Sequence, residues 1–224
     1  MTIPQDPGDT ATYADRVAWH VPALHDLHRM TGLLLAERIS DTGRVLVLGA
    51  GGGMELRSLV ERYPGWRFDG VDPSAAMLDQ ARETMGDLVE RASLHEGYVN
   101  DAPDGPFDGA VCLLTLHFLP RDERLRTLRQ LAKRLRPGAP LVVAHHSFPT
   151  GGTHRDLWLR RNADYLISRG VPSSQAEQGI QTMKARLPVL TPEEDEAVLR
   201  EADFEDVQLF FAALTFKGWV AVRK

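Results

Sequence analysis

Hydrophobic residues follow two alternating patterns along most of this chain. Short runs that are apolar throughout, such as 45–48 and 141–144, have the length of buried strands. Residues 121–136 instead repeat their apolar positions every three or four residues, as an amphipathic helix does. Because continuously apolar strands fit parallel sheets covered on both faces, this alternation predicts an α/β fold.

The same patterns predict the elements and their grouping. Strands are expected at 45–48, 66–71, 92–96, 107–114, 141–144, 207–212 and 214–222. Helices are expected at 12–39 (broken near Pro22), 53–63, 73–85, 121–136, 154–169, 173–187 and 191–202. We expect four parts: an N-terminal helical cap (1–40), a core (41–149), a helical insertion (150–188), and a closing helix and hairpin (189–224).

Composition narrows the class of protein. The 224 residues carry a net charge of −5 without a basic stripe, so nothing predicts nucleic-acid binding. Cys112, the single cysteine, lies in an apolar run and is expected to be a buried thiol. No apolar segment reaches the length of a membrane span, and the N-terminus lacks a secretory core. We therefore expect a soluble, cytoplasmic protein.

A glycine loop follows the first predicted strand and precedes a predicted helix. Gly49, Gly51 and Gly53 form the pattern G-x-G-x-G. A dinucleotide-binding loop would place its third glycine at Met54, and a triphosphate-binding loop would end in Gly-Lys-Ser/Thr. Such a loop lets the backbone approach a ligand, with free N–H groups at the helix start.

Asp72 ends the second predicted strand. In α/β nucleotide folds an acid at this point accepts hydrogen bonds from ribose hydroxyls. The alternative is a plain helix cap, with Pro73 beginning the next helix.

Several segments together resemble one family. VLVLGAGGG (45–53) resembles motif I of the class I S-adenosylmethionine-dependent methyltransferases. Phe107-Asp108, LRPGA (135–139) and ADFEDV (202–207) resemble that family at the corresponding places, so the resemblance spans residue 44 to the C-terminus apart from the insertion. One departure is Val47, where the family carries an acid that Glu55 would replace.

The resemblance implies a fold and a cofactor. The expected fold is a Rossmann-like, doubly wound, seven-stranded, mostly parallel sheet with an antiparallel last strand, N-terminal helices and a helical lid insertion. The expected cofactor is S-adenosyl-L-methionine. Its expected contacts are Gly49, Ala50, Gly51, Gly53, Asp72, Pro73, Leu114 and Thr115, with Tyr98 and Val99 beside the adenine and Arg16 at the methionine carboxylate.

Three histidines are candidate general bases. His117 follows the fourth strand, at the edge of the sheet where α/β folds bind ligands. The alternative is a histidine packed beneath the next helix. His145 and His146 end the fifth strand, and adjacent strand residues point to opposite faces, so at most one of them faces a given pocket. With His154 they match no standard zinc spacing, so we expect no metal.

The insertion at 150–188 is expected to cover the substrate. Trp158, Arg161 and Tyr165 are candidate substrate contacts, as is Tyr13 in the N-terminal helix. The alternative for the insertion is the surface of a homodimer.

Three functions remain open. The first is methyl transfer to a small-molecule nucleophile by in-line displacement. The second is a related use of the cofactor, because Thr115–Leu119 and Phe211–Gly218 also resemble carboxy-S-adenosylmethionine synthases. The third is cofactor binding without catalysis.

Overall fold

A seven-stranded sheet is the centre of the computed structural model, which describes residues 18–224. The expectations for Tyr13 and Arg16 lie outside these residues. Within them the strand order is β3-β2-β1-β4-β5-β7-β6, and β7 alone runs opposite to the other strands, which confirms the expected fold. The strands are β1 (Arg44–Leu48), β2 (Arg67–Asp72), β3 (Ala92–Glu96), β4 (Gly109–Leu113), β5 (Pro140–His146), β6 (Phe204–Ala213) and β7 (Phe216–Arg223).

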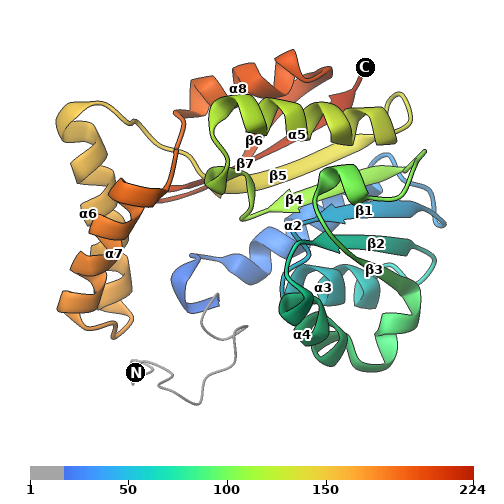
Figure 1. Cartoon of the computed structure of the whole chain (residues 1–224), viewed down its shortest axis with the longest axis horizontal. Coiled ribbons are helices and arrows are strands. Elements are labelled where there is room, and N and C mark those ends of the chain that lie inside the picture. Colours follow the sequence, from blue (N-terminus) through green and yellow to red (C-terminus); the bar gives the residue numbers. More distant parts are fainter. Residues whose placement is uncertain (1–17) are drawn as a thin grey trace.

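Helices cover both faces of the sheet (Figure 1). One layer holds α2 (Leu24–Ala36), α3 (Met54–Arg62) and α4 (Ala75–Met85). The other layer holds α5 (Arg121–Arg134) and α8 (Pro192–Glu201). Two further helices, α6 (Gly152–Ser168) and α7 (Ser173–Arg186), pair with each other beside the end of β5.

Each central strand is buried on both faces. Leu46 and Cys112 pack in the core beneath α5 and α8, whereas Val45, Val47 and Val111 pack beneath α2, α3 and α4. Cys112 is fully buried, and burial raises the pKa of its thiol. These two cores explain why the strands read as continuous apolar runs.

The strand order reverses beside β1. Strands β2 and β3 lie on one side of β1, and β4 and β5 lie on the other. The glycine loop leaves β1 at this reversal, and the segment 114–118 leaves β4 next to it. Crevices at such reversals, outside the carboxyl ends of the strands, are where α/β sheets bind ligands.

Some elements differ from the sequence prediction. Strand β5 continues to His146, because β7 pairs with it as far as His146 and Phe216. Helix α4 begins at Ala75 and not at Pro73, because the Ser74 hydroxyl accepts a hydrogen bond from the Met77 N–H.

Candidate functional site

A cavity of about 290 Å³ lies at the carboxyl ends of β1, β2 and β4. It joins the glycine loop, the end of β2 and the end of β4. Its lining residues are Leu24, His28, Gly49, Ala50, Gly51, Gly52, Met54, Glu55, Asp72, Pro73, Met77, Leu113, Leu114, Thr115 and Phe118. We call it the first cavity.

The loop needs its glycines for two reasons. Gly49, Gly51 and Gly53 have φ angles of 78°, 49° and 81°, in the left-handed region that glycine tolerates best. A Cβ on Gly49 would lie 2.0 Å from Thr115 Oγ1, and one on Gly53 would lie 2.8 Å from the Cα of Ala81. The loop therefore packs tightly against β4 and α4 while one side remains open to the cavity.

Asp72 holds this loop from the end of β2. Its Oδ2 accepts a hydrogen bond from the Gly51 N–H at 2.9 Å, and its Oδ1 accepts one from the Ser74 N–H at 2.9 Å. A carboxylate oxygen has two lone pairs, so both oxygens retain acceptor capacity beside the cavity. The N-cap of α4 is Ser74 and not Asp72. Asp72 is therefore not a plain helix cap, because it also binds the glycine loop.

Glu55 places a second carboxylate at this cavity. It is buried at the start of α3, and within residues 18–224 its Oε1 has no hydrogen-bond partner. Burial, followed by the nearby charge of Asp72, raises the pKa of Glu55 well above its ordinary value. A buried, unpaired carboxylate is costly, and a cationic group on a ligand would offset that cost.

The tip of β4 forms the opposite wall. Leu114 has a φ of 57°, an unusual conformation for a branched side chain. Its N–H donates to the Ala144 carbonyl at 2.6 Å, which anchors the strained turn to β5. Such strain often occurs at ligand sites.

The two residues expected beside the adenine lie outside the lining of the first cavity. Tyr98 is 69% exposed, and Val99 is buried in the core beneath α5. Neither lines the first cavity, so their placement gives no support to an adenine contact. Leu24, His28 and Met77 line it instead, and their sequence pattern had indicated only helix packing.

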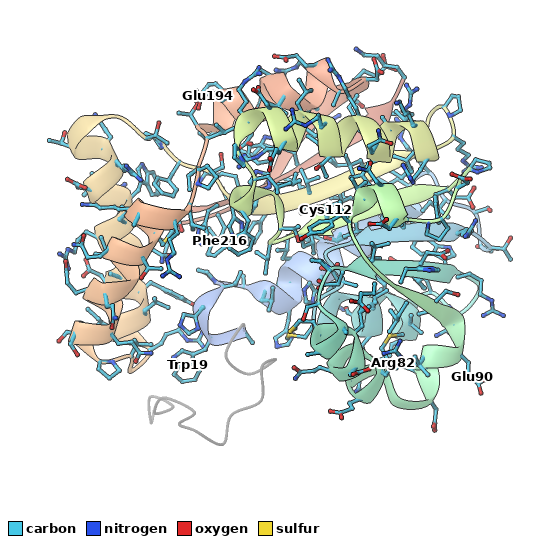
Figure 2. The ribbon with its side chains drawn as sticks, viewed as in Figure 1. Trp19, Arg82, Glu90, Cys112, Glu194 and Phe216 are labelled. Atoms are coloured by element: carbon cyan, nitrogen blue, oxygen red, sulfur yellow. The ribbon has the colours of Figure 1, made fainter. Side chains whose placement is uncertain are left out.

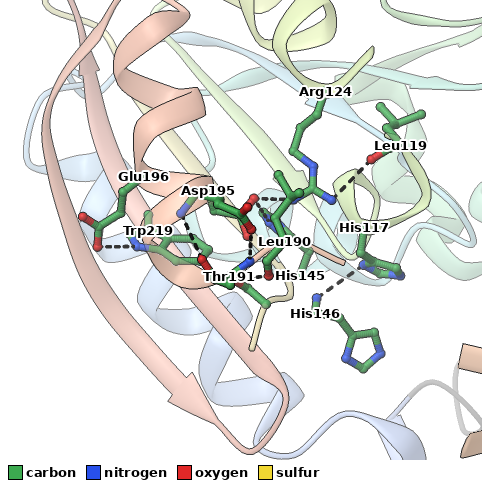
Figure 3. A network of polar contacts seen from close by, with 12 residues as sticks. His117, Leu119, Arg124, His145, His146, Leu190, Thr191, Asp195, Glu196 and Trp219 are labelled. Carbon is green, nitrogen blue, oxygen red and sulfur yellow. Dashed lines mark hydrogen bonds and ion pairs between the residues drawn. The ribbon is translucent and has the colours of Figure 1, made fainter. Parts of the chain in front are cut away.

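The three histidines separate into two groups (Figure 3). His145 faces α5 and α8, where its Nε2 lies 3.2 Å from Asp195 Oδ1 and where Asp195 also pairs with Arg124. This buried cluster is away from the cavities, so the placement does not support His145 as a base. His117 and His146 are neighbours, with ring centroids 4.9 Å apart.

His117 connects the first cavity to His146. Its ring centroid lies 4.2 Å from that of Phe118, which lines the first cavity. Burial, then His146, His145 and Arg124, lowers the pKa of His117 well below its usual value. Burial and then His145 lower the pKa of His146 to about 3. Both rings are therefore neutral near pH 7.

A second cavity, of about 330 Å³, lies between the sheet and the α6–α7 pair. Figure 2 marks Phe216 between the sheet and these helices. The lining residues are His20, His146, Leu159, Asn162, Ala163, Leu166, Val171, Gln175, Ala176, Gly179, Ile180, Thr182, Met183 and Phe216.

The candidate substrate residues of the insertion lie beside this cavity and not in its lining. The side chain of Arg161 stacks on Trp158, and the Tyr165 hydroxyl accepts a hydrogen bond from Arg169. The lining face of α6 is offset from theirs: Leu159, Asn162, Ala163 and Leu166 recur with helical spacing. The helical spacing of Leu159, Ala163 and Leu166 was the sequence signal that could have identified the lining face.

Between residues 18 and 224, no group of three or more His, Cys, Asp or Glu side chains is placed to hold a metal ion. None of the helices in that range is long and apolar enough to cross a membrane.

Comparison with known proteins is consistent with this site. Residues 46–141 match a methyltransferase domain. The carboxy-S-adenosyl-L-methionine synthase of Chromohalobacter salexigens is 27% identical over 218 residues, which are 95% of this chain and 80% of that protein. The synthase of Pseudomonas putida KT2440 is 26% identical over 94% of this chain and 88% of its own.

Solved structures share the fold. A protein from Bordetella parapertussis has a TM-score of 0.68 at 21% identity, covering 99% of this chain and 76% of its own. Human N-acetylserotonin methyltransferase, solved in complex with S-adenosylmethionine, has a TM-score of 0.60 at 16% identity. That comparison covers 90% of this chain but 54% of the human protein, so the chain spans about half of that relative.

Proposed function

We propose that the chain is a class I S-adenosylmethionine-dependent methyltransferase and that it methylates a small-molecule nucleophile. The observation that carries the proposal is that residues 49–52 of the glycine loop and Asp72 lie together in the wall of one cavity. S-adenosylmethionine, when bound, supplies a methyl group that is already activated by a positively charged sulfur.

We assign the lining residues of the first cavity to that cofactor. Asp72 would accept hydrogen bonds from the ribose hydroxyls, since both of its oxygens retain lone pairs. Gly49, Ala50 and Gly51 line the cavity and would let the backbone approach the cofactor. Gly53 does not line it and would act by shaping the loop at the start of α3. Glu55 would pair with a positive charge, because its buried Oε1 has no partner within residues 18–224. Leu114 and Thr115 would form the far wall.

The protein's part in the transfer is positioning. Its residues hold the acceptor in line with the bond that breaks, and they exclude water. The acceptor gains the methyl group, and S-adenosylhomocysteine is released. Where the acceptor must lose a proton, the neutral imidazoles of His146 and His117 are the candidates to receive it, but burial lowers both pKa values and makes each a weak base.

Titration calorimetry tests this assignment directly. We expect S-adenosylmethionine and S-adenosylhomocysteine to bind, and Asp72→Ala to weaken both by about tenfold or more, because a charge-assisted hydrogen bond is lost. The exposed Asp79→Ala in α4 is the matched control and should bind normally. If the wild-type protein binds neither compound at millimolar concentration, the proposal is wrong.

A second candidate is a carboxy-S-adenosylmethionine synthase-like reaction. It is favoured by the similarity to those synthases over nearly the whole chain. Mass spectrometry separates the two reactions, because methyl transfer adds mass to the acceptor, whereas carboxylation adds it to the cofactor. Cofactor binding with neither product would favour a non-catalytic protein. The homodimer and the cytoplasmic location remain predictions.

A further inference from the structure

The second cavity has a mainly apolar lining with a few polar, uncharged side chains. The apolar lining residues include Leu159, Leu166, Ile180, Met183 and Phe216. We call His146 and Asn162 the polar end, and the other polar lining residues are His20, Gln175 and Thr182. Within residues 18–224 no Arg, Lys, Asp or Glu lines it. A charged ligand would therefore lose its water there without gaining an ionic partner.

Hydrogen bonds at the polar end determine which nitrogen of His146 carries the proton. The Thr215 hydroxyl donates its hydrogen to Asn162 Oδ1 at 3.0 Å. The same hydroxyl oxygen lies 3.0 Å from His146 Nδ1. Because a hydroxyl has one hydrogen, Thr215 must accept from Nδ1–H of His146. The remaining nitrogen, Nε2, is then a hydrogen-bond acceptor.

This Nε2 is available to a ligand. Among the described residues it makes no hydrogen bond, although its ring lines the cavity. Thr215 is fully buried and Asn162 is buried, so the chain of bonds that orients the ring is shielded from water. Burial keeps the imidazole neutral, with a pKa of about 3, so Nε2 retains its lone pair at physiological pH.

The polar end lies on the side of the cofactor cavity. His146 contacts His117, and the His146 backbone N–H points to His117 Nδ1 at 3.5 Å. His117 in turn packs on Phe118, which lines the first cavity. A molecule that reaches Nε2 of His146 would therefore approach the first cavity with its polar group leading.

We propose that the second cavity binds an uncharged, mainly apolar acceptor that donates one O–H or N–H hydrogen bond to His146 Nε2. This inference rests on the proposed function, since it identifies the class of molecule that would be methylated. It excludes carboxylated and phosphorylated acceptors, which would need a cation in the lining.

A panel of matched probes tests the hydrogen bond. Bicyclic phenols, their methyl ethers and the corresponding aryl carboxylates are titrated into the protein saturated with S-adenosylhomocysteine. We expect the phenols to bind about tenfold more tightly than their methyl ethers, and the carboxylates to bind least. Thr215→Val removes the acceptor for Nδ1–H, so the preference for phenols over ethers should fall towards unity.

Gly179→Leu tests the location. A Cβ on Gly179 in α7 meets nothing within 4 Å, so a leucine side chain fits there and occupies the second cavity. We expect it to weaken phenol binding at least tenfold while S-adenosylhomocysteine binding is unchanged. Gln178→Leu, exposed on the same helix and outside the lining, should change neither.

The outcomes distinguish the two proposals. If S-adenosylhomocysteine binds but no phenol does, or if the carboxylates bind best, the inference is overturned and the cofactor assignment stands. Phenol binding that Gly179→Leu leaves intact also overturns it. If S-adenosylhomocysteine does not bind, the proposed function itself fails.

Discussion

At the scale of single residues, the carboxylate of Glu55 has two opposing effects. Its Oε1 is buried without a hydrogen-bond partner in the described chain, which destabilises the protein by itself. The same carboxylate lines the proposed cofactor site. Stability and cofactor affinity should therefore change in opposite directions when the charge is removed.

Glu55→Gln tests this opposition. We expect the free energy of unfolding of the cofactor-free protein to rise by about 1 kcal/mol, because a buried charge is removed. Affinity for S-adenosylmethionine should fall about tenfold, because the positive ligand loses its partner. Urea unfolding and calorimetry measure the two effects. Glu61→Gln, exposed at the end of the same helix, is the control, and a loss of stability in Glu55→Gln would contradict the interpretation.

Gly49→Ala tests the tight approach of the loop to β4. The new Cβ would meet Thr115 Oγ1, and φ is 78°, so we expect a loss of about 3 kcal/mol or more in unfolding free energy. Gly138→Ala is the matched control. Its φ is 79°, but a Cβ there meets nothing within 4 Å, so only the backbone strain of about 1 kcal/mol applies. Equal losses would show that the contact with Thr115 does not matter.

At the scale of elements, one buried ion pair joins α5 to α8. Arg124 on α5 and Asp195 on α8 are 0% and 2% exposed, and His145 of β5 completes the cluster. Burial acts to raise the pKa of Asp195, but the charges and hydrogen bonds of His145 and Arg124 outweigh it, so this pKa lies below its usual value. The cluster fixes both helices against the sheet.

Asp195→Asn should lower the free energy of unfolding by about 3–5 kcal/mol, because Arg124 is left buried without its counter-charge. Chemical denaturation at neutral pH measures the loss. Glu201→Gln removes an exposed pair with Arg121 between the same two helices, so it should cost about 1 kcal/mol or less. If both substitutions cost the same, the buried cluster has no special role.

The sequence predicted where the strands lie better than it predicted which face of a helix lines a cavity. Continuous apolar runs identified the strands, because strands buried on both faces leave little alternative. In α6 the sequence predicted substrate contacts at Trp158, Arg161 and Tyr165, yet the face offset by one residue lines the cavity. The face of α6 that is buried depends on where the helix packs, and that contact is not encoded locally.

At the scale of the whole molecule, buried neutral histidines make stability depend on pH. Burial and then His25 lower the pKa of His28 to about 4, and burial lowers the pKa of His146 to about 3. His117 is shifted in the same direction. In the unfolded chain these histidines bind protons near pH 6.5, whereas in the folded chain they stay neutral at that pH. Their contribution to the free energy of unfolding is therefore fully present above pH 6.5 and is lost as the pH falls below it.

Between pH 6.5 and 5.5 we expect the free energy of unfolding to fall by roughly 1 kcal/mol for each of these histidines. Urea titrations at pH 6.5 and 5.5 measure the difference. His28→Gln should reduce this pH-dependent loss of unfolding free energy by roughly 1 kcal/mol, the contribution of one histidine. His154→Gln, at an exposed position, should leave the loss unchanged. A stability that increases towards pH 5.5 would contradict the buried neutral state.

The local order of residues was enough to determine the strands, the glycine loop and the acid that ends β2. Each depends on neighbours in the chain, on hydrophobic spacing and on backbone angles that only certain residues tolerate. Only the tertiary structure decided that His145 joins an ion pair while His146 lines a cavity, and that Thr215 links His146 to Asn162. Those contacts join β5 to α8, and β5 to α6 through the turn between β6 and β7. Strand pairing and helix packing alone bring these segments together.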